Sequence, residues 1–119
     1  MSDERGDDAR VVLVTAPDVA TARKLAESVV ASRAAACANL LPGVTSIYSW
    51  KGRVESDEEV LMIVKTTQAR LPELERAITE AHPYEVPEFV VLTASHVAGP
   101  YQAWLRAAVE SVGGDSPSA

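Results

Sequence analysis

Apolar residues follow two different patterns along this chain. Three runs are apolar at nearly every position: RVVLVTA from Arg10, VLMIVKT from Val60 and FVVLTAS from Phe89. Short runs of this kind are typical of strands that are buried on both faces. Three other segments carry an apolar residue every three or four positions, which is typical of amphipathic helices. The pattern therefore predicts a chain that alternates strands and helices.

The three predicted helices have recognisable ends. The first covers Val19–Ala34 and follows Asp18, a favourable N-cap residue. The second covers residues 71–82 and ends before Pro83, because proline disfavours helical geometry in the residue that precedes it. The third covers residues 101–112. The apolar stripes of the three helices contain Ala22, Leu25, Ala26 and Val29, then Leu71, Leu74 and Ile78, then Tyr101, Trp104, Leu105 and Ala108.

The longest predicted element is a hairpin over Ala36–Thr66. Its turn is placed at Lys51-Gly52, since a two-residue loop with glycine in second place suits the tight turns that match strand twist. Each arm of roughly 14 residues spans about 45 Å, whereas a globule of this length measures about 35 Å across. We therefore predict that Pro42-Gly43 breaks the first arm into two strands. The tip, Tyr48–Val54, is predicted to project and contact another chain.

The predicted order of elements is strand, helix, strand, strand, helix, strand and a terminal helix. Right-handed crossovers place both main helices on one face of a four-stranded antiparallel sheet. The predicted fold class is α+β, a ferredoxin-like βαββαβ sandwich with a long β-hairpin and an extra C-terminal helix. Because the helices cover one face while the strands are apolar on both, we predict a symmetric oligomer that covers the other face. Trp50 should lose most of its exposure only in this oligomer.

The length of 119 residues corresponds to one domain. We expect an acidic, disordered tail over residues 1–9, a folded domain over residues 10–112 and a second disordered tail over residues 113–119. The formal net charge of −6 and the lack of a basic stripe argue against nucleic acid as a partner.

Three features of the sequence predict a cytoplasmic protein without a membrane partner. No apolar run approaches the roughly 20 residues of a membrane span, and the N-terminal MSDERGDDAR lacks the apolar segment of a signal peptide. The single cysteine, Cys37, cannot form an internal disulfide and is compatible with a reducing compartment.

Three residues are candidates for metal chemistry, each with a structural alternative. Cys37 is expected to be a structural thiol that packs as a small apolar residue. His82 either interacts with the end of the second helix or serves as a metal ligand, because imidazole suits copper and zinc. His96 is expected in a surface turn. Together the three lack the spacing of a structural metal site.

One face of the hairpin gathers residues that suit either a ligand pocket or a subunit interface. Glu59 and Lys65 lie on one side of the return arm by the two-residue period. If the turn sets the register, Tyr48 and Trp50 project to the same side. The acidic run at residues 55–59, ESDEE, is most simply a solvated face that discourages edge-to-edge pairing. The chain has no recognisable catalytic motif, so we predict that it is not an enzyme.

Several sequence blocks together resemble the CutA family, the divalent-cation tolerance proteins. The blocks occur in the order TAPD, AACANLLPG, YSWKG, EVLMIVKTT and HPYEVPE, and the similarity extends from about Val11 to Val112. The resemblance implies a ferredoxin-like fold and a tight homotrimer close in architecture to PII-type signalling trimers. Bacterial members are linked to tolerance of copper and other divalent metals, and animal relatives to the anchoring of acetylcholinesterase.

The resemblance also bears on the metal ligands. The copper site proposed for the family uses a cysteine in the first strand and two adjacent histidines before Pro-Tyr. Val14 occupies the cysteine position here, and Ala81-His82 occupies the histidine pair, so only His82 carries over. Cys37 matches a different family cysteine, in the AAC block.

Two functional hypotheses follow. In the first, a cytoplasmic homotrimer binds copper or another divalent metal, or responds to it, with Tyr84 and Glu88 close to His82. In the second, a PII-like trimer without a metal function binds a small anionic ligand in an inter-subunit pocket. The residues assigned to that pocket are Tyr48, Trp50, Glu59, Lys65, Tyr84 and Glu88. A third possibility is a very stable scaffold whose function lies in a partner protein.

Overall fold

Strands and helices follow one another in the predicted order. A computed structural model of the chain describes residues 6–110. The elements are β1 (Ala9–Ala16), α1 (Val19–Ala31), β2 (Cys37–Trp50), β3 (Arg53–Thr67), a 3-10 turn (Gln68–Arg70), α2 (Leu71–Ala81), β4 (Val90–Thr93) and α3 (Gly99–Ala108).

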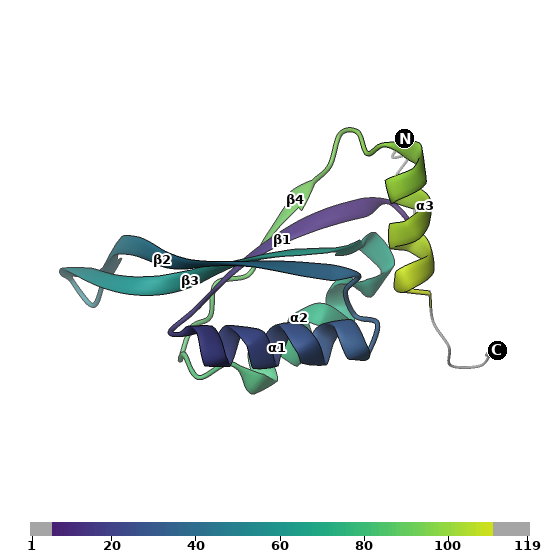
Figure 1. The fold of residues 1–119 in the computed structure, drawn as a ribbon. Coiled ribbons are helices and arrows are strands. Elements are labelled where there is room, and N and C mark those ends of the chain that lie inside the picture. Colours follow the sequence, from purple (N-terminus) through teal and green to yellow (C-terminus); the bar gives the residue numbers. More distant parts are fainter. Residues whose placement is uncertain (1–5, 111–119) are drawn as a thin grey trace.

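The four strands form one antiparallel sheet in the order β2-β3-β1-β4. Helices α1 and α2 lie side by side under one face of this sheet, and α3 stands across the end that is distant from the hairpin tip (Figure 1). This is the split βαβ arrangement of the ferredoxin-like fold, so the predicted fold class is confirmed.

The two faces of the sheet differ in how well they are covered. On the helix side, Val12, Val14 and Met62 are fully buried and belong to the main core with the inner stripes of α1 and α2. On the opposite face, Val90 and Leu92 remain 45% and 46% exposed. Helix α3 covers only one end of that face, where a small separate cluster forms from Ala9, Ala36, Leu105 and Val109. A single chain therefore buries one face of its sheet and leaves most of the other open.

The hairpin projects beyond the body of the molecule, as its length predicted. The described chain measures 48 × 33 × 22 Å, and the β2–β3 tip forms one end of its long axis (Figure 1). Lys51 and Gly52 both have positive φ, 53° and 79°, as a type I′ turn requires. The predicted break in the first arm is wrong: β2 is continuous, and Pro42 and Gly43 form a bulge opposite Val60.

Several element ends differ from the sequence prediction. Helix α1 stops at Ala31, three residues early, because Arg33 takes a left-handed conformation with φ 66°. Helix α2 ends at Ala81, and His82 is extended, as expected for the residue before proline. Strand β4 has only four residues, and α3 runs from Gly99 to Ala108, earlier at both ends than predicted. Residues 111 and 112 lie outside the described part.

The acidic tail predicted over residues 1–9 is wrong at its last four positions. Ala9 already pairs with Thr67 in the sheet. The carbonyl groups of Gly6 and Asp8 each accept a backbone hydrogen bond of 2.9 Å from the segment after β3. The carboxylate of Asp7 lies 3.2 Å from Nε of Arg106 on α3. The rest of that tail (residues 1–5) and the predicted tail at 113–119 lie outside the described residues.

Candidate functional site

A groove lies where the hairpin meets the connector between α2 and β4. Its volume is about 720 Å³. One wall comes from β2 and β3 and the other from residues 84–88. The residues that line it are Thr15, Ser46, Ile47, Tyr48, Ser49, Trp50, Asp57, Glu59, Tyr84, Glu85, Val86, Pro87 and Glu88.

Five of the six residues assigned to the pocket lie in this groove, and the sixth does not. Tyr48 and Trp50 share the face of Glu59, as the register set by the turn predicted. Lys65 lies on the same face but farther along β3. There its Nζ donates to Asn39 Oδ1 at 2.9 Å and lies 5.9 Å from the ring centroid of Tyr101 on α3. Within one chain, Lys65 is therefore not part of the site.

Tyr84 connects the two walls of the groove. Its hydroxyl donates to Glu59 Oε2 on β3 at 2.5 Å. Its backbone N–H donates to His82 Nδ1 at 3.1 Å, and the two rings lie 4.6 Å apart between centroids. The extended conformation of His82 before Pro83 turns the chain back toward the sheet. The connector is thus held against β3 by a side chain that the local sequence pattern alone does not position.

Both ring nitrogens of His82 are engaged within the chain. Nε2 lies 2.6 Å from the carbonyl oxygen of Thr15 on β1, which can only accept a hydrogen bond. Nδ1 faces the N–H of Tyr84, which can only donate. His82 is therefore the neutral tautomer with its proton on Nε2, and it is 8% exposed. A metal ion could bind Nδ1 only if the bond from Tyr84 were broken.

The electrostatics of the groove are those of closely spaced acidic groups. The hydrogen bond from its hydroxyl to Asp57 raises the pKa of Tyr48 to about 12. Burial, followed by the hydrogen bond to Glu59, raises the pKa of Tyr84. Burial and then the charge of Glu59 raise the pKa of Glu88. Both tyrosines therefore stay protonated near neutral pH and act as donors.

The residues present do not fit a metal centre within one chain. Among residues 6–110 no three His, Cys, Asp or Glu side chains are grouped so that they could hold an ion. Val14 is an alkyl side chain buried in the core on the helix side, and Ala81 has no donor atom in its side chain. Of the implied copper ligands, only His82 has a suitable side chain, and its nitrogens are already used.

Two acidic residues in the groove were not singled out from the sequence as site residues. Asp57 belongs to the acidic run predicted to be a solvated face, although it shares the parity of Glu59 along β3 and therefore lies on the same face. That two-residue period was the available signal. Glu85 lies on the connector, where no periodicity applies, so only the tertiary structure places it in the groove.

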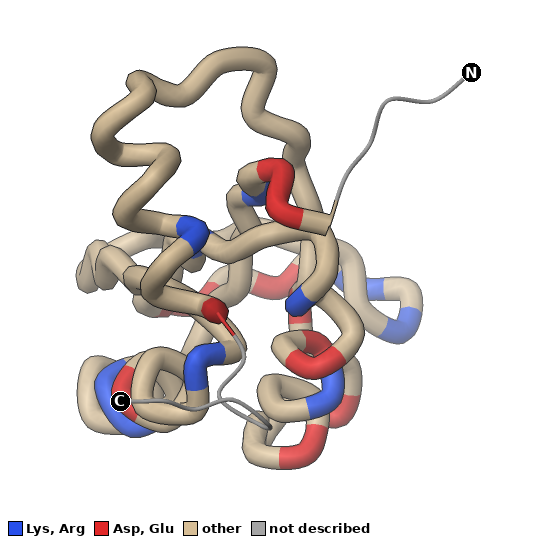
Figure 2. Tube along the Cα trace, turned by 90° about the vertical axis from the view of Figure 1, so that its right-hand side faces the viewer, with Lys and Arg blue, Asp and Glu red and all other residues tan. Residues whose placement is uncertain are grey.

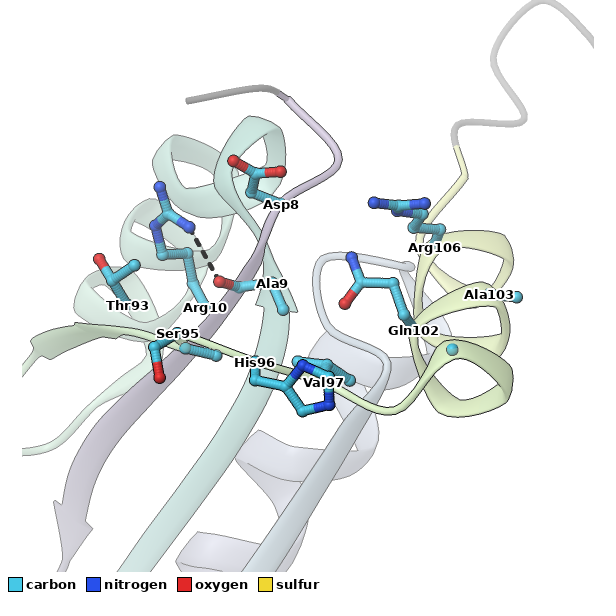
Figure 3. Close-up of a pocket in the computed structure, with 12 residues that line it drawn as sticks. Asp8, Ala9, Arg10, Thr93, Ser95, His96, Val97, Gln102, Ala103 and Arg106 are labelled. Atoms are coloured by element: carbon cyan, nitrogen blue, oxygen red, sulfur yellow. Dashed lines mark hydrogen bonds between the residues drawn. The ribbon is translucent and has the colours of Figure 1, made fainter. Parts of the chain in front are cut away.

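The remaining candidates lie away from the groove. Cys37 is a half-buried free thiol that packs against the cluster under α3. His96 is exposed on the loop after β4, as predicted. It borders a second hollow between β1 and α3, where Arg10 and Asp8 lie on one side and Gln102 and Arg106 on the other (Figure 3).

Charged residues are interspersed over the described surface. Lys and Arg positions are scattered among Asp and Glu positions and do not form a continuous basic stripe in this view (Figure 2). In the described part of the chain, none of the helices is both long and apolar enough to span a membrane.

The fold and the groove together define a class of protein, a ferredoxin-like α+β domain with an acidic, aromatic-lined groove and an uncovered apolar sheet face. The family model described as CutA1 divalent ion tolerance protein matches residues 10–108. The chain belongs to this family.

Individual relatives agree with this assignment. The divalent-cation tolerance protein CutA of Citrobacter koseri is 48% identical over 102 residues, which cover 86% of this chain and 89% of the relative. The structure of the divalent cation tolerance protein Cut A1 from Thermus thermophilus has a TM-score of 0.81 at 44% identity and covers 83% and 96% of the two chains. A structure described as the periplasmic CutA of Archaeoglobus fulgidus has a TM-score of 0.83 at 26% identity, with coverage of 86% and 99%. The predicted family is confirmed.

Proposed function

We propose that this chain acts in tolerance of divalent cations as a homotrimer that binds cations, copper among them, and does not catalyse a reaction. The observation that carries the proposal is the groove: Asp57, Glu59, Glu85 and Glu88 line it, and among its described lining residues none is lysine or arginine. A concave surface with charge of one sign raises the local concentration of the opposite ion. The groove also adjoins His82 through Tyr84.

The open sheet face supports the assembly. Val90, Leu92 and Leu41 are 43% to 46% exposed in the single chain, and an apolar surface of this kind is a normal subunit interface. Three copies is the number that the family resemblance implies. We propose a cytoplasmic location, with which a single free cysteine is compatible; cell fractionation checks this location.

Assembly also bears on metal binding. Because one chain offers no group of three ligands among its described residues, we propose that donor atoms from more than one copy complete the coordination. In such a site His82 would supply Nδ1, which in the single chain accepts from the N–H of Tyr84.

Titration calorimetry with Cu²⁺ and Zn²⁺ on the assembled, untagged protein tests the proposal. Saturable binding is expected, and His82→Ala should weaken it by about tenfold or more. His96→Ala is the matched control, since His96 is an exposed loop histidine, and it should bind as the wild type does. Weak binding that is equal in all three proteins would contradict the proposal.

A second candidate function is binding of a small molecule without a metal, as in PII-like modules. The groove volume of about 720 Å³ favours it, because ligand pockets commonly measure about 300–1,000 Å³. The anionic ligand expected from the sequence does not match this groove within one chain, since Lys65 lies elsewhere and the groove is acidic.

A further inference from the structure

The groove combines carboxylates with aromatic rings. Tyr48 and Trp50 project from β2, and Tyr84 lies on the opposite wall. An ammonium group is attracted to the face of such rings, and the methylene groups beside it pack on them. Lys51 already shows this property in the same chain, because its Nζ lies 5.5 Å from the centroid of the Trp50 ring. The walls therefore suit an organic cation.

Glu59 provides an unused acceptor in the groove. The residue is 8% exposed, and its Oε2 accepts from the hydroxyl of Tyr84. Within residues 6–110 its Oε1 receives no hydrogen bond, and neither Glu59 nor Glu88 is paired with a basic side chain. A carboxylate oxygen that faces the groove and receives no donor from the described chain can accept a hydrogen bond from a ligand.

The distribution of the carboxylates decides the kind of cation. They do not converge as ligands of a metal ion in the described chain. Asp57 and Glu59 are two residues apart on β3, a distance of about 7 Å along a strand, and Glu88 lies on the facing wall. Separated charges of this kind match separated ammonium groups that are joined by a short methylene chain.

We propose that the groove binds a linear polyamine. One ammonium donates to Glu59 Oε1, a second meets Asp57 or Glu88, and the methylene chain between them packs on Tyr84 and Trp50. This ligand goes beyond the cation tolerance proposed above and does not require a metal.

Titration calorimetry with spermidine tests the proposal, on the assembled protein in EDTA and in a buffer without amines. Saturable binding with one site per chain is expected. Glu59→Gln keeps the shape of the side chain and should weaken binding about tenfold; Glu88→Gln should act in the same direction. Trp50→Leu should weaken it about threefold. Glu58→Gln is the matched control, because Glu58 lies on the other face of the same strand and changes the net charge equally.

Three results would overturn the proposal. The first is no saturable binding, as expected if a basic side chain of a second copy already occupies the groove. The second is equal weakening by Glu58→Gln and Glu59→Gln, which indicates a general charge effect. The third is full displacement of spermidine by MgCl₂ at a constant ionic strength, measured without EDTA.

If Glu59→Gln does not fold, Glu88→Gln and Trp50→Leu still decide the question. The main assay contains EDTA, so a failure to bind spermidine does not contradict the proposed metal binding. Likewise, a failure to bind copper in the other titration does not contradict the proposed polyamine site.

Discussion

Two neighbouring residues of β3 show how differently the two faces of the sheet are covered. Met62 points to α1 and α2 and is fully buried in the main core. Ile63 points to the other face, where it stands opposite Leu13 of β1 and remains partly exposed. Both side chains are apolar, yet only one of them has a complete set of packing partners within the chain.

The difference shows that a strand pattern can describe an assembly rather than a single chain. A sheet with one wet face should alternate apolar and polar residues. This sheet does not, because its second face is apolar without an internal cover. The pattern is explained if the missing layer is another copy of the chain, and the two faces should then respond differently to substitution.

The largest effect on folding is expected on the helix face. Met62→Ala removes a fully buried side chain and should lower the free energy of unfolding by about 2–5 kcal/mol. Denaturant unfolding measures this loss. Met62→Leu, which nearly conserves volume, should cost less than about 1.5 kcal/mol. Equal losses in the two variants would mean that the face is not closely packed.

On the open face, a substitution in β3 should change the oligomeric state of the protein and not its fold. Ile63→Lys places a charge on the uncovered surface and should reduce the mass in solution to that of one chain, while the circular dichroism of the fold is retained. Light scattering after gel filtration measures the mass. Val19→Lys is the control, because Val19 is an exposed apolar residue on α1, and it should assemble normally. Retained assembly in Ile63→Lys would contradict the proposed interface.

Trp50 reports on the same transition. It is 37% exposed in the single chain and is predicted to lose most of that exposure when copies assemble. Acrylamide quenching in a Trp104→Phe background, which leaves Trp50 as the only tryptophan, should be weak in the assembly and strong after Ile63→Lys. Equal quenching in both states would show that the hairpin tip does not reach a neighbour.

A smaller effect is expected where the connector is held to the sheet. Tyr84→Phe removes the hydroxyl that donates to Glu59 and should cost about 1 kcal/mol, since the site is partly open to solvent. Thermal unfolding measures the loss. Tyr101→Phe on α3 is the control, because its hydroxyl has no hydrogen bond among the described residues. No difference between the two variants would show that the bond does not stabilise the fold.

The smallest effect is a dependence on pH at Glu88. Its pKa in the folded chain is raised, so its contribution favours the folded state at low pH and is lost as the pH rises through the folded value. Glu88→Gln should therefore be more stable than the wild type by a few tenths of a kcal/mol at pH 7. The advantage should vanish below about pH 4, where glutamate itself is protonated. Unfolding at both pH values checks this, and an advantage that persists in acid would exclude the charge as its cause.

Much of the fold could be predicted because the signals are local. The N-cap at Asp18 is confirmed by a 2.7 Å hydrogen bond from the N–H of Thr21, and the turn at Lys51-Gly52 lies where the glycine placed it. The end of α1 was missed, because the left-handed Arg33 carries no sequence signal of its own. Ordering of residues 6–9 was also missed, since it depends on contacts with α3 and with the segment after β3.

The residues of the candidate site also divide into those placed by local sequence signals and those placed by tertiary contacts. By itself the sequence determined which side chains share a face of the hairpin, because the two-residue period and the turn are local properties, and it placed Tyr48, Trp50 and Glu59 together. Only the tertiary structure placed the hydroxyl of Tyr84 against the carboxylate of Glu59 and gave both ring nitrogens of His82 hydrogen-bond partners. It also placed Lys65 at the other end of β3, against Asn39. Those outcomes depend on how a connector distant in the chain packs against the sheet, and no local period specifies such packing.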